Sequence, residues 1–304
     1  MKIRQIGELG LIRRMARNVR VDNTVLHGIG DDTAVIRWTR NKHLLFTCDM
    51  LIEDLHFKRS EATPYQIGWK AIARNISDIA AMGGLPRYAT VSAAVDPGLN
   101  VSFLDGIVKG MLSACRKFGV NIVGGDTARS SRIVIDIAMV GEVEKRNLVL
   151  RSGAKPGDVI LVTGSIGGSI KGKHLNFVPR LKEARELVSG YKVNAMIDIS
   201  DALLLDLRRL LDSSGVGARL YEGLVPLSSG VSTVESAIRE GEDFELLFTM
   251  RPGEAKKLFR SGMAKFDTDI TLIGEITAKK DGYILVDQDG KKRRVKGAEG
   301  FLHF

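Results

Sequence analysis

Six short motifs in this 304-residue chain place an acidic residue beside small or acidic neighbours. They occupy residues 28–32, 47–49, 75–78, 124–127, 198–201 and 241–243. The chain is basic overall, so acids placed this selectively call for a chemical reason. Carboxylates beside flexible backbone suit hard divalent cations, which take oxygen ligands. Magnesium held by a few carboxylates and by substrate phosphates is typical of phosphoryl-transfer sites.

Two of these motifs contain acids at expected strand ends, where α/β proteins place ligands. Asp198 follows the apolar run that begins at residue 195, and Asp201 falls at the start of an expected helix. Capping by Ser200 and Asp201 would explain those two residues without any function. It would not explain Asp198. Asp49 also follows an apolar run, residues 44–48, and is expected to mark a strand end.

A third motif lies on a long helix expected over residues 64–82, which two glycines then end. Its apolar face is formed by Ile72, Ile76 and Ile79. Lys70, Arg74 and Ser77 fall on the opposite face, which is an amphipathic pattern. Asp78 lies on a stripe beside the apolar face, from which a carboxylate can point into a cleft.

Strands and helices are expected to alternate along the whole chain. Further strands are predicted at 34–36, 44–48, 88–95, 120–123, 133–139, 159–162, 195–199 and 243–250, and further helices at 101–118 and 200–211. The basic, polar stretch 142–151 is the best boundary, and it divides the chain into domains 1–145 and 146–304. This order predicts an α/β (α+β) fold of two domains.

Glycine-rich segments follow two of the expected strands. Residues 124–127 are expected to form a turn, and residues 163–169 a loop that could bind phosphate. Residues 167–174 nearly match a P-loop, but His174 stands where a hydroxyl should bind magnesium. A structural turn and a different phosphate loop both remain open for this segment.

Composition limits the possible classes of function. The formal net charge is +9, 44% of residues are hydrophobic and 27% are charged, which is ordinary for a soluble globular protein. No apolar run approaches the ~18 residues of a membrane helix, and two cysteines make no disulfide framework, so a cytoplasmic location is expected. Nucleic-acid binding would need clustered basic residues, and the one tight cluster, 291–294, is equally explained by a hairpin. No Ser-His-Asp, Cys-His or zinc pattern is present.

Taken in order, the motifs resemble those of the thiamine-monophosphate kinases, whose superfamily includes aminoimidazole ribonucleotide synthetase and selenophosphate synthetase. The matching segments are 28–32, Asp49 with His56 and Phe57, 70–83, 124–127, 151–158, 162–164, 198–201 and 241–246. The resemblance runs from residues 7–8 to residues 300–304, and the segments 151–158 and 70–83 are its most specific parts.

This resemblance implies an N-terminal mixed sheet with helices that pairs across a homodimer, and a C-terminal α/β domain. It implies ATP-dependent phosphorylation of thiamine monophosphate to thiamine diphosphate by direct in-line transfer of the γ-phosphoryl group. Several Mg²⁺ ions would assist. No covalent or general-base residue is expected, and no nucleic-acid or membrane partner.

Site residues carry over by position. Those implied to lie around magnesium are Asp32, Thr47, Cys48, Asp49, Asp78, Asp126, Asp198 and Asp201. Those implied to contact ATP are Gly125, Asp126, Arg151 and Ser200. Those implied to contact thiamine monophosphate are His56, Glu242 and Phe301, the last flat against an aromatic ring of the substrate.

Some positions depart from the family pattern. Cys48 stands where Thr is expected, Ala202 follows Asp201 in place of Gly, and the segment 212–240 is short. The alternatives are another ATP-dependent enzyme of the superfamily and a non-catalytic thiamine-phosphate binding protein. The latter should have lost metal carboxylates, whereas here all six are present.

Overall fold

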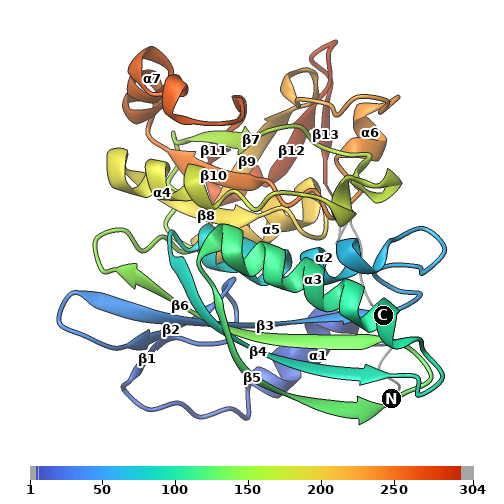
Figure 1. Cartoon of the computed structure of the whole chain (residues 1–304). Helices are drawn as coiled ribbons and strands as arrows, with labels where there is room; N and C mark the ends of the chain where they lie inside the picture. The colour runs from blue at the N-terminus through green and yellow to red at the C-terminus, as the bar shows by residue number, and fades with distance from the viewer. Residues whose placement is uncertain (1–4, 6, 296–304) are drawn as a thin grey trace.

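The chain folds around two β-sheets, with the helices α2 and α3 between them (Figure 1). The computed structural model describes residue 5 and residues 7–295. The helices are α1 (Gly7–Ala16), α2 (Pro64–Ala81), α3 (Val101–Phe118), α4 (Leu181–Gly190), α5 (Leu203–Ser214), α6 (Val234–Ala237) and α7 (Pro252–Ser261). The predicted α/β architecture is confirmed.

The first sheet is built from the N-terminal half and has the strand order β1-β2-β3-β6-β4-β5. Its strands are β1 (Val25–His27), β2 (Ala34–Arg37), β3 (Lys42–Ile52), β4 (Leu85–Val95), β5 (Asn121–Arg129) and β6 (Val134–Glu144). All its pairs are antiparallel except β4 with β5, so the predicted mixed sheet is confirmed. Burial alternates along β6, because one face of the sheet is covered by helices.

The second sheet is built from the C-terminal half and has the strand order β13-β12-β9-β11-β7-β10-β8. Its strands are β7 (Val159–Thr163), β8 (Val193–Asp198), β9 (Gly217–Tyr221), β10 (Leu246–Met250), β11 (Ile270–Thr277), β12 (Tyr283–Val286) and β13 (Lys292–Arg294). The basic cluster at 291–294 lies in the β12–β13 hairpin, one of the two explanations for it left open by the sequence.

Helix α2 is the central element of the molecule, in contact with α3, with β3 and β6 of the first sheet and with α4 and β8 of the second half. Thr63 and Gln66 form a capping box at its start, and Gly83, at a φ of 73°, follows its end. Glycines allow α2 and α3 to pack closely: a Cβ on Gly68 would lie 1.9 Å from the Ile107 carbonyl oxygen, and one on Gly110 would lie 2.0 Å from that of Tyr65.

The polar face of α2 does not have the environment that its amphipathic pattern suggests. Lys70 and Ser77 are buried, at 0% and 1% exposure, because the second half of the chain covers this face. The periodicity therefore identified the residues that share a face, but that face meets another domain and not water.

Two predicted strand boundaries are wrong. Strand β3 continues through Asp49 to Ile52, so Asp49 lies inside a strand and not at its end. Residues 124–127 belong to β5 and do not form a turn, because this segment pairs in parallel with β4. Gly125 suits that pairing, since a Cβ there would lie 1.9 Å from the Val91 carbonyl oxygen.

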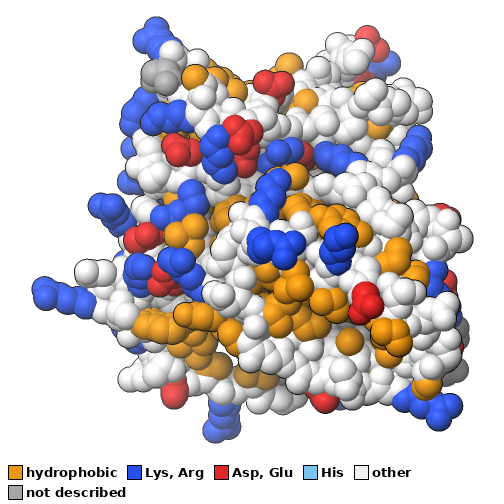
Figure 2. Space-filling view, viewed as in Figure 1, with side chains coloured by type: hydrophobic (Ala, Val, Ile, Leu, Met, Phe, Trp, Pro, Cys, Tyr) orange, Lys and Arg blue, Asp and Glu red, His pale blue; other side chains and the backbone are white. Residues whose placement is uncertain are grey.

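Lys and Arg side chains are spread over the face shown in Figure 2, interspersed with acids and not gathered in one patch. A band of hydrophobic side chains crosses the same view, where α3 exposes Val101, Val108 and Leu112. Among the helices of residues 7–295, none is long and apolar enough to span a bilayer.

Candidate active site

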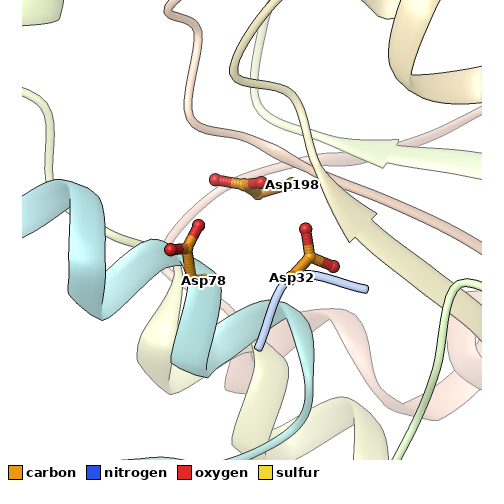
Figure 3. Close-up of side chains that lie close together, drawn as sticks. All are labelled: Asp32, Asp78 and Asp198. Atoms are coloured by element: carbon orange, nitrogen blue, oxygen red, sulfur yellow. The ribbon is translucent and has the colours of Figure 1, made fainter. Parts of the chain in front are cut away.

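Three carboxylates from distant parts of the chain meet where the two halves adjoin. Asp32 comes from the loop before β2, Asp78 from α2 and Asp198 from the last residue of β8 (Figure 3). Each offers one oxygen, and these oxygens all lie within 4.8 Å of one another. Three residues of the predicted magnesium set are thus brought together, and they are called the acidic cluster below.

Neighbouring side chains hold these carboxylates in place. Thr47 on β3 donates a hydrogen bond to Asp78 Oδ2 at 2.6 Å, and Ser77 on α2 donates one to Asp198 Oδ2 at 2.6 Å. Arg151 Nη2 contacts Asp32 Oδ1 at 2.5 Å. Thr47 and Arg151, both predicted site residues, therefore lie at the cluster.

Burial and mutual repulsion raise the pKa values of two carboxyls in the acidic cluster. Burial raises the pKa of Asp78 well above its usual value, and the charges of Asp49, Asp198 and Asp32 raise it further. Burial and the charge of Asp32 raise the pKa of Asp198 in the same way. Such paired, buried carboxylates are typical of functional sites.

Two further predicted metal residues, Asp49 and Asp201, each pair with an arginine. Asp49 on β3 accepts a hydrogen bond from Arg74 Nη2 at 3.3 Å, and Asp201 pairs with Arg209 Nη1 at 2.6 Å. Asp49 contributes to the field on Asp78.

The capping explanation for Ser200 and Asp201 is wrong. The N-cap of α5 is Ala202, which makes no side-chain cap bond. The carboxylate of Asp206, in the first turn, instead accepts hydrogen bonds from the amides of Asp201 and Ala202 at 3.0 and 3.1 Å. Ser200 and Asp201 are thus free of a capping role, and both line the pocket described below.

Other predicted residues face away from the cluster. Along β3 the buried Thr47 alternates with the exposed Cys48, whose Sγ lies 3.2 Å from Asp136 Oδ1. Asp126 on β5 aligns across the sheet with Ser92 on β4, which aligns with Asp136 on β6. Because aligned residues on neighbouring strands share a face, Asp126 lies on the face opposite the helices. The side chains of Cys48 and Asp126 are therefore not brought to the cluster within one chain.

A pocket lies beside the cluster, between the segment after β3 and the segment 241–244. It is lined by Leu55, His56, Phe57, Arg74, Ile170, His174, Leu175, Ser200, Asp201, Glu242 and Phe244, with Asp54, Lys58, Glu61 and Gly241. The lining combines five large apolar side chains with six charged ones and two histidines, so the pocket can pack against a ring and orient a ligand by charge.

Glu242 is the fixed anion of this pocket. Its carboxylate lies 2.7 Å from Lys70 Nζ and 2.8 Å from His174 Nδ1. Burial alone would raise the pKa of Glu242, but the hydrogen bonds from His174 and Lys70 and the charge of Lys70 lower it to about 2. Burial lowers the pKa of Lys70 to about 8, so both partners are ionised near neutral pH.

Three non-glycine residues that line the pocket, Asp54, Glu242 and Phe244, have positive φ values, with 67° at Asp54. Glu242 and Phe244 have φ values of 63° and 51°, a region that side chains other than glycine rarely adopt. The loop lies tight against Asp201, because a Cβ on Gly241 would be 2.4 Å from the Asp201 carbonyl oxygen. Strained backbone of this kind is often found at binding sites.

The glycine-rich loop after β7 is occupied by carboxylates of the protein itself. The amides of Gly167 and Gly168 donate to Asp243 and Glu240, and Ser169 donates to Asp243. These donors are what a phosphate loop would offer. Of the two possibilities left open, the structure therefore favours a structural turn.

The remaining predicted substrate residues have different positions. His56 lines the pocket and is held by a hydrogen bond from the Ile52 amide to its Nδ1 at 3.0 Å. Phe301 lies outside the described residues, so its contact with substrate stays a prediction. The sequence analysis named Lys70, Arg74 and His174 but gave none of them a role in the site. The repeat of charged residues at positions 70, 74 and 78, one helical turn apart, was the available signal.

Two family models together match most of the chain. "AIR synthase related protein, N-terminal domain" matches residues 30–143, and "AIR synthase related protein, C-terminal domain" matches residues 155–287. These matches agree with the two sheets of the fold. The fold and site define a two-domain protein of the AIR synthase related class.

Individual relatives narrow this class. The thiamine-monophosphate kinase of Rhodopirellula baltica is 39% identical over 91% of this chain and 90% of its own length. That of Buchnera aphidicola (subsp. Acyrthosiphon pisum) is 34% identical over 95% of both. The solved structure of AaThiL complexed with AMPPCP and TMP is 32% identical, with a TM-score of 0.84, covering 100% of this chain and 99% of that one. The chain belongs to the thiamine-monophosphate kinase family.

Proposed function

We propose that this protein transfers the γ-phosphoryl group of ATP to the phosphate of thiamine monophosphate, forming thiamine diphosphate. The observation that carries the proposal is the acidic cluster, which lies beside a pocket with a fixed anion in a member of the thiamine-monophosphate kinase family. The similar structure AaThiL was solved with AMPPCP, an ATP analogue, and with TMP.

Magnesium fits the acidic cluster. Asp32 Oδ2 is buried and has no hydrogen-bond partner among the described residues, so it can accept a cation. At 4.8 Å, two unit charges repel by about 3.5 kcal/mol at an effective dielectric of ~20, so ionised carboxylates this close need a counterion. Asp32, Asp78 and Asp198 would hold magnesium, with Asp49 and Asp201 at the margin. When bound, magnesium would neutralise phosphate charge and polarise the transferred group.

The protein's own residues then have mainly positioning roles. The acceptor is a phosphate oxygen that is already ionised, so no general base has to remove a proton. Arg151, held beside the cluster by Asp32, would direct its guanidinium to the phosphates of ATP, with Ser200 nearby. The pKa of about 2 keeps Glu242 anionic, which suits a cationic thiazolium ring.

We also propose that the protein acts as a homodimer joined through the open face of the N-terminal sheet. All nine residues of β5 are exposed, and this sheet exposes Phe46, Met50, Tyr88 and Ile122. Gly125 and Asp126 lie on β5, so their predicted part in binding ATP and magnesium depends on this pairing. Light scattering of the purified protein should give twice the chain mass of 33.2 kDa, whereas a monomer would contradict the pairing.

The proposed activity is tested with purified protein, ATP, magnesium and thiamine monophosphate, with products separated by chromatography. Thiamine diphosphate and ADP should appear in equal amounts. If no thiamine diphosphate forms and ATP stays intact, the proposal is wrong. Hydrolysis of ATP without thiamine diphosphate would indicate another enzyme of the same superfamily.

A further inference from the structure

Three charged residues lie along one stripe of α2. Lys70, Arg74 and Asp78 follow one another at intervals of four residues, so their side chains project from the same side of the helix. Lys70 contacts Glu242 in the pocket, and Asp78 belongs to the acidic cluster. At 1.5 Å per residue these two positions are about 12 Å apart along the axis, with Arg74 midway between them.

Arg74 is loosely held for a buried arginine. Its guanidinium bonds to the Met50 carbonyl at 3.2 Å, the long end of the normal range, and to Asp49 Oδ1 at 3.3 Å, just beyond it. Its Nε is buried without a hydrogen-bond partner in the described structure. Arg180, in contrast, donates two hydrogen bonds of 2.5 and 2.7 Å to the Glu245 carboxylate.

Arg74 keeps hydrogen-bonding capacity at the wall of the pocket. The residue lines the pocket, its side chain is 14% exposed, and a guanidinium carries five N–H donors, of which two are used here. The carboxylates of Asp49, Glu242, Asp78 and Asp201 keep it fully charged, raising its pKa against the opposing effect of burial.

We propose that Arg74 binds the phosphate of the acceptor substrate between the Glu242 pocket and the acidic cluster. This inference rests on the proposed function, because it assigns a residue to the phosphate of thiamine monophosphate. If the cationic ring of thiamine monophosphate lies beside Glu242, the arm that carries its phosphate runs along α2 toward Asp78. On this path the phosphate passes Arg74. A planar guanidinium with free donors suits a phosphate, which it can bind with two parallel hydrogen bonds.

The alternative role for Arg74 is structural, as a counter-charge that offsets the acids around it. Thiamine lacks the phosphate but shares the rings, so it separates the two roles. A phosphate contact affects only the affinity for thiamine monophosphate. A structural counter-charge affects both ligands, or the stability of the fold.

The test is calorimetric titration of the full chain with thiamine monophosphate and with thiamine, in magnesium and without ATP. Arg74→Gln should weaken binding of thiamine monophosphate by roughly 10- to 100-fold, the scale of a lost charge-assisted bond, and leave thiamine binding unchanged. The KM of thiamine monophosphate should rise with it, and the KM of ATP should change little. Arg219→Gln is the matched control, because Arg219 pairs with Glu275 on the second sheet, away from the pocket.

Equal weakening of both ligands, or no change for thiamine monophosphate, would overturn the inference. If Arg74→Gln fails to fold, Arg74→Lys decides, since lysine keeps the charge but loses the two-pronged geometry. It should lower the preference for thiamine monophosphate over thiamine, and an unchanged preference would refute the phosphate contact. Failure of the proposed function is recognised separately, as wild-type protein that forms no thiamine diphosphate.

Discussion

Replacing Asp78 by asparagine should abolish the activity and at the same time stabilise the metal-free protein. One oxygen of Asp78 lies within 4.8 Å of an oxygen of Asp32 and of Asp198, and Thr47 donates a hydrogen bond to Asp78 Oδ2. Asparagine has nearly the same shape and still accepts the Thr47 hydrogen bond, so the change removes charge and little else.

The size of the effect follows from that separation. Each fully ionised neighbour at 4.8 Å would contribute about 3.5 kcal/mol of repulsion at an effective dielectric of ~20. Burial keeps the cluster partly protonated, which reduces this repulsion. We therefore expect Asp78→Asn in EDTA to raise the unfolding free energy by about 1–3 kcal/mol, or Tm by roughly 2–6 °C.

Turnover should respond in the opposite direction. Loss of one carboxylate from the cluster should lower kcat by at least about 100-fold, the scale of losing one group that stabilises transition-state charge. Saturating magnesium should stabilise wild type more than the variant, because the variant has lost a ligand. Asp212→Asn on the exposed side of α5 is the control and should alter neither quantity.

The measurements are scanning calorimetry with EDTA and with magnesium, and the turnover assay described above. A variant that is less stable than wild type in EDTA would show that Asp78 is needed for the fold. Unchanged turnover would show that the carboxylate does not serve the reaction. Either result would refute the reasoning.

Three further predictions concern the structure around the site. Lys70→Met should lower the unfolding free energy by about 2–3 kcal/mol in denaturant titrations, because it leaves the largely buried Glu242 carboxylate with His174 but without its lysine. Adding Glu242→Gln should recover most of the loss, and no recovery would mean that the pair is not coupled. Gly68→Ala should destabilise by roughly 1–3 kcal/mol because its Cβ would overlap a backbone atom of α3, whereas Gly190→Ala, which meets nothing, should be near neutral; equal effects would contradict the close packing. Burial raises the pKa of Asp206 to about 6. Between pH 4 and 6 the folded protein therefore keeps a proton that the unfolded chain, with a pKa near 3.8, has released. The stability that this group contributes is lost as the pH rises through that range. Asp206→Asn should flatten that part of the pH profile measured in EDTA, and parallel profiles for variant and wild type would count against it.

Local signals predicted some elements well, whereas α4, α7, β9, β11 and β12 were not predicted. The helix over residues 101–118 was predicted to the residue, because an amphipathic run ends at Gly119, which adopts the left-handed conformation at a φ of 71°. The turn predicted at 124–127 was wrong for an equally physical reason. Glycine favours turns, but at Gly125 it permits close approach of β4, which lies far away in sequence.

The site was only partly predictable. Asp32, Asp78 and Asp198 were expected through the family resemblance, and the fold brings them together. The contact of Lys70 with Glu242 spans 172 residues of sequence, and no local pattern encodes it. The sequence placed Lys70, Arg74 and Ser77 opposite the apolar face of α2, but periodicity cannot reveal that the second half of the chain covers that side.

The charged stripe on α2 also limits the length of the acceptor substrate. Lys70, Arg74 and Asp78 are fixed on one rigid helix, so the spacing of about 12 Å between the Glu242 end and the acidic cluster cannot adapt to the ligand. The helix therefore fixes the distance between the ring and the phosphate of an acceptor that can react. A phosphate ester whose arm is a few atoms shorter would bind beside Glu242 with its phosphate out of reach of the cluster, and a longer one would carry it past. The protein would then select its acceptor substrate by arm length as well as by charge. No side chain would need to contact the atoms that differ between the substrates.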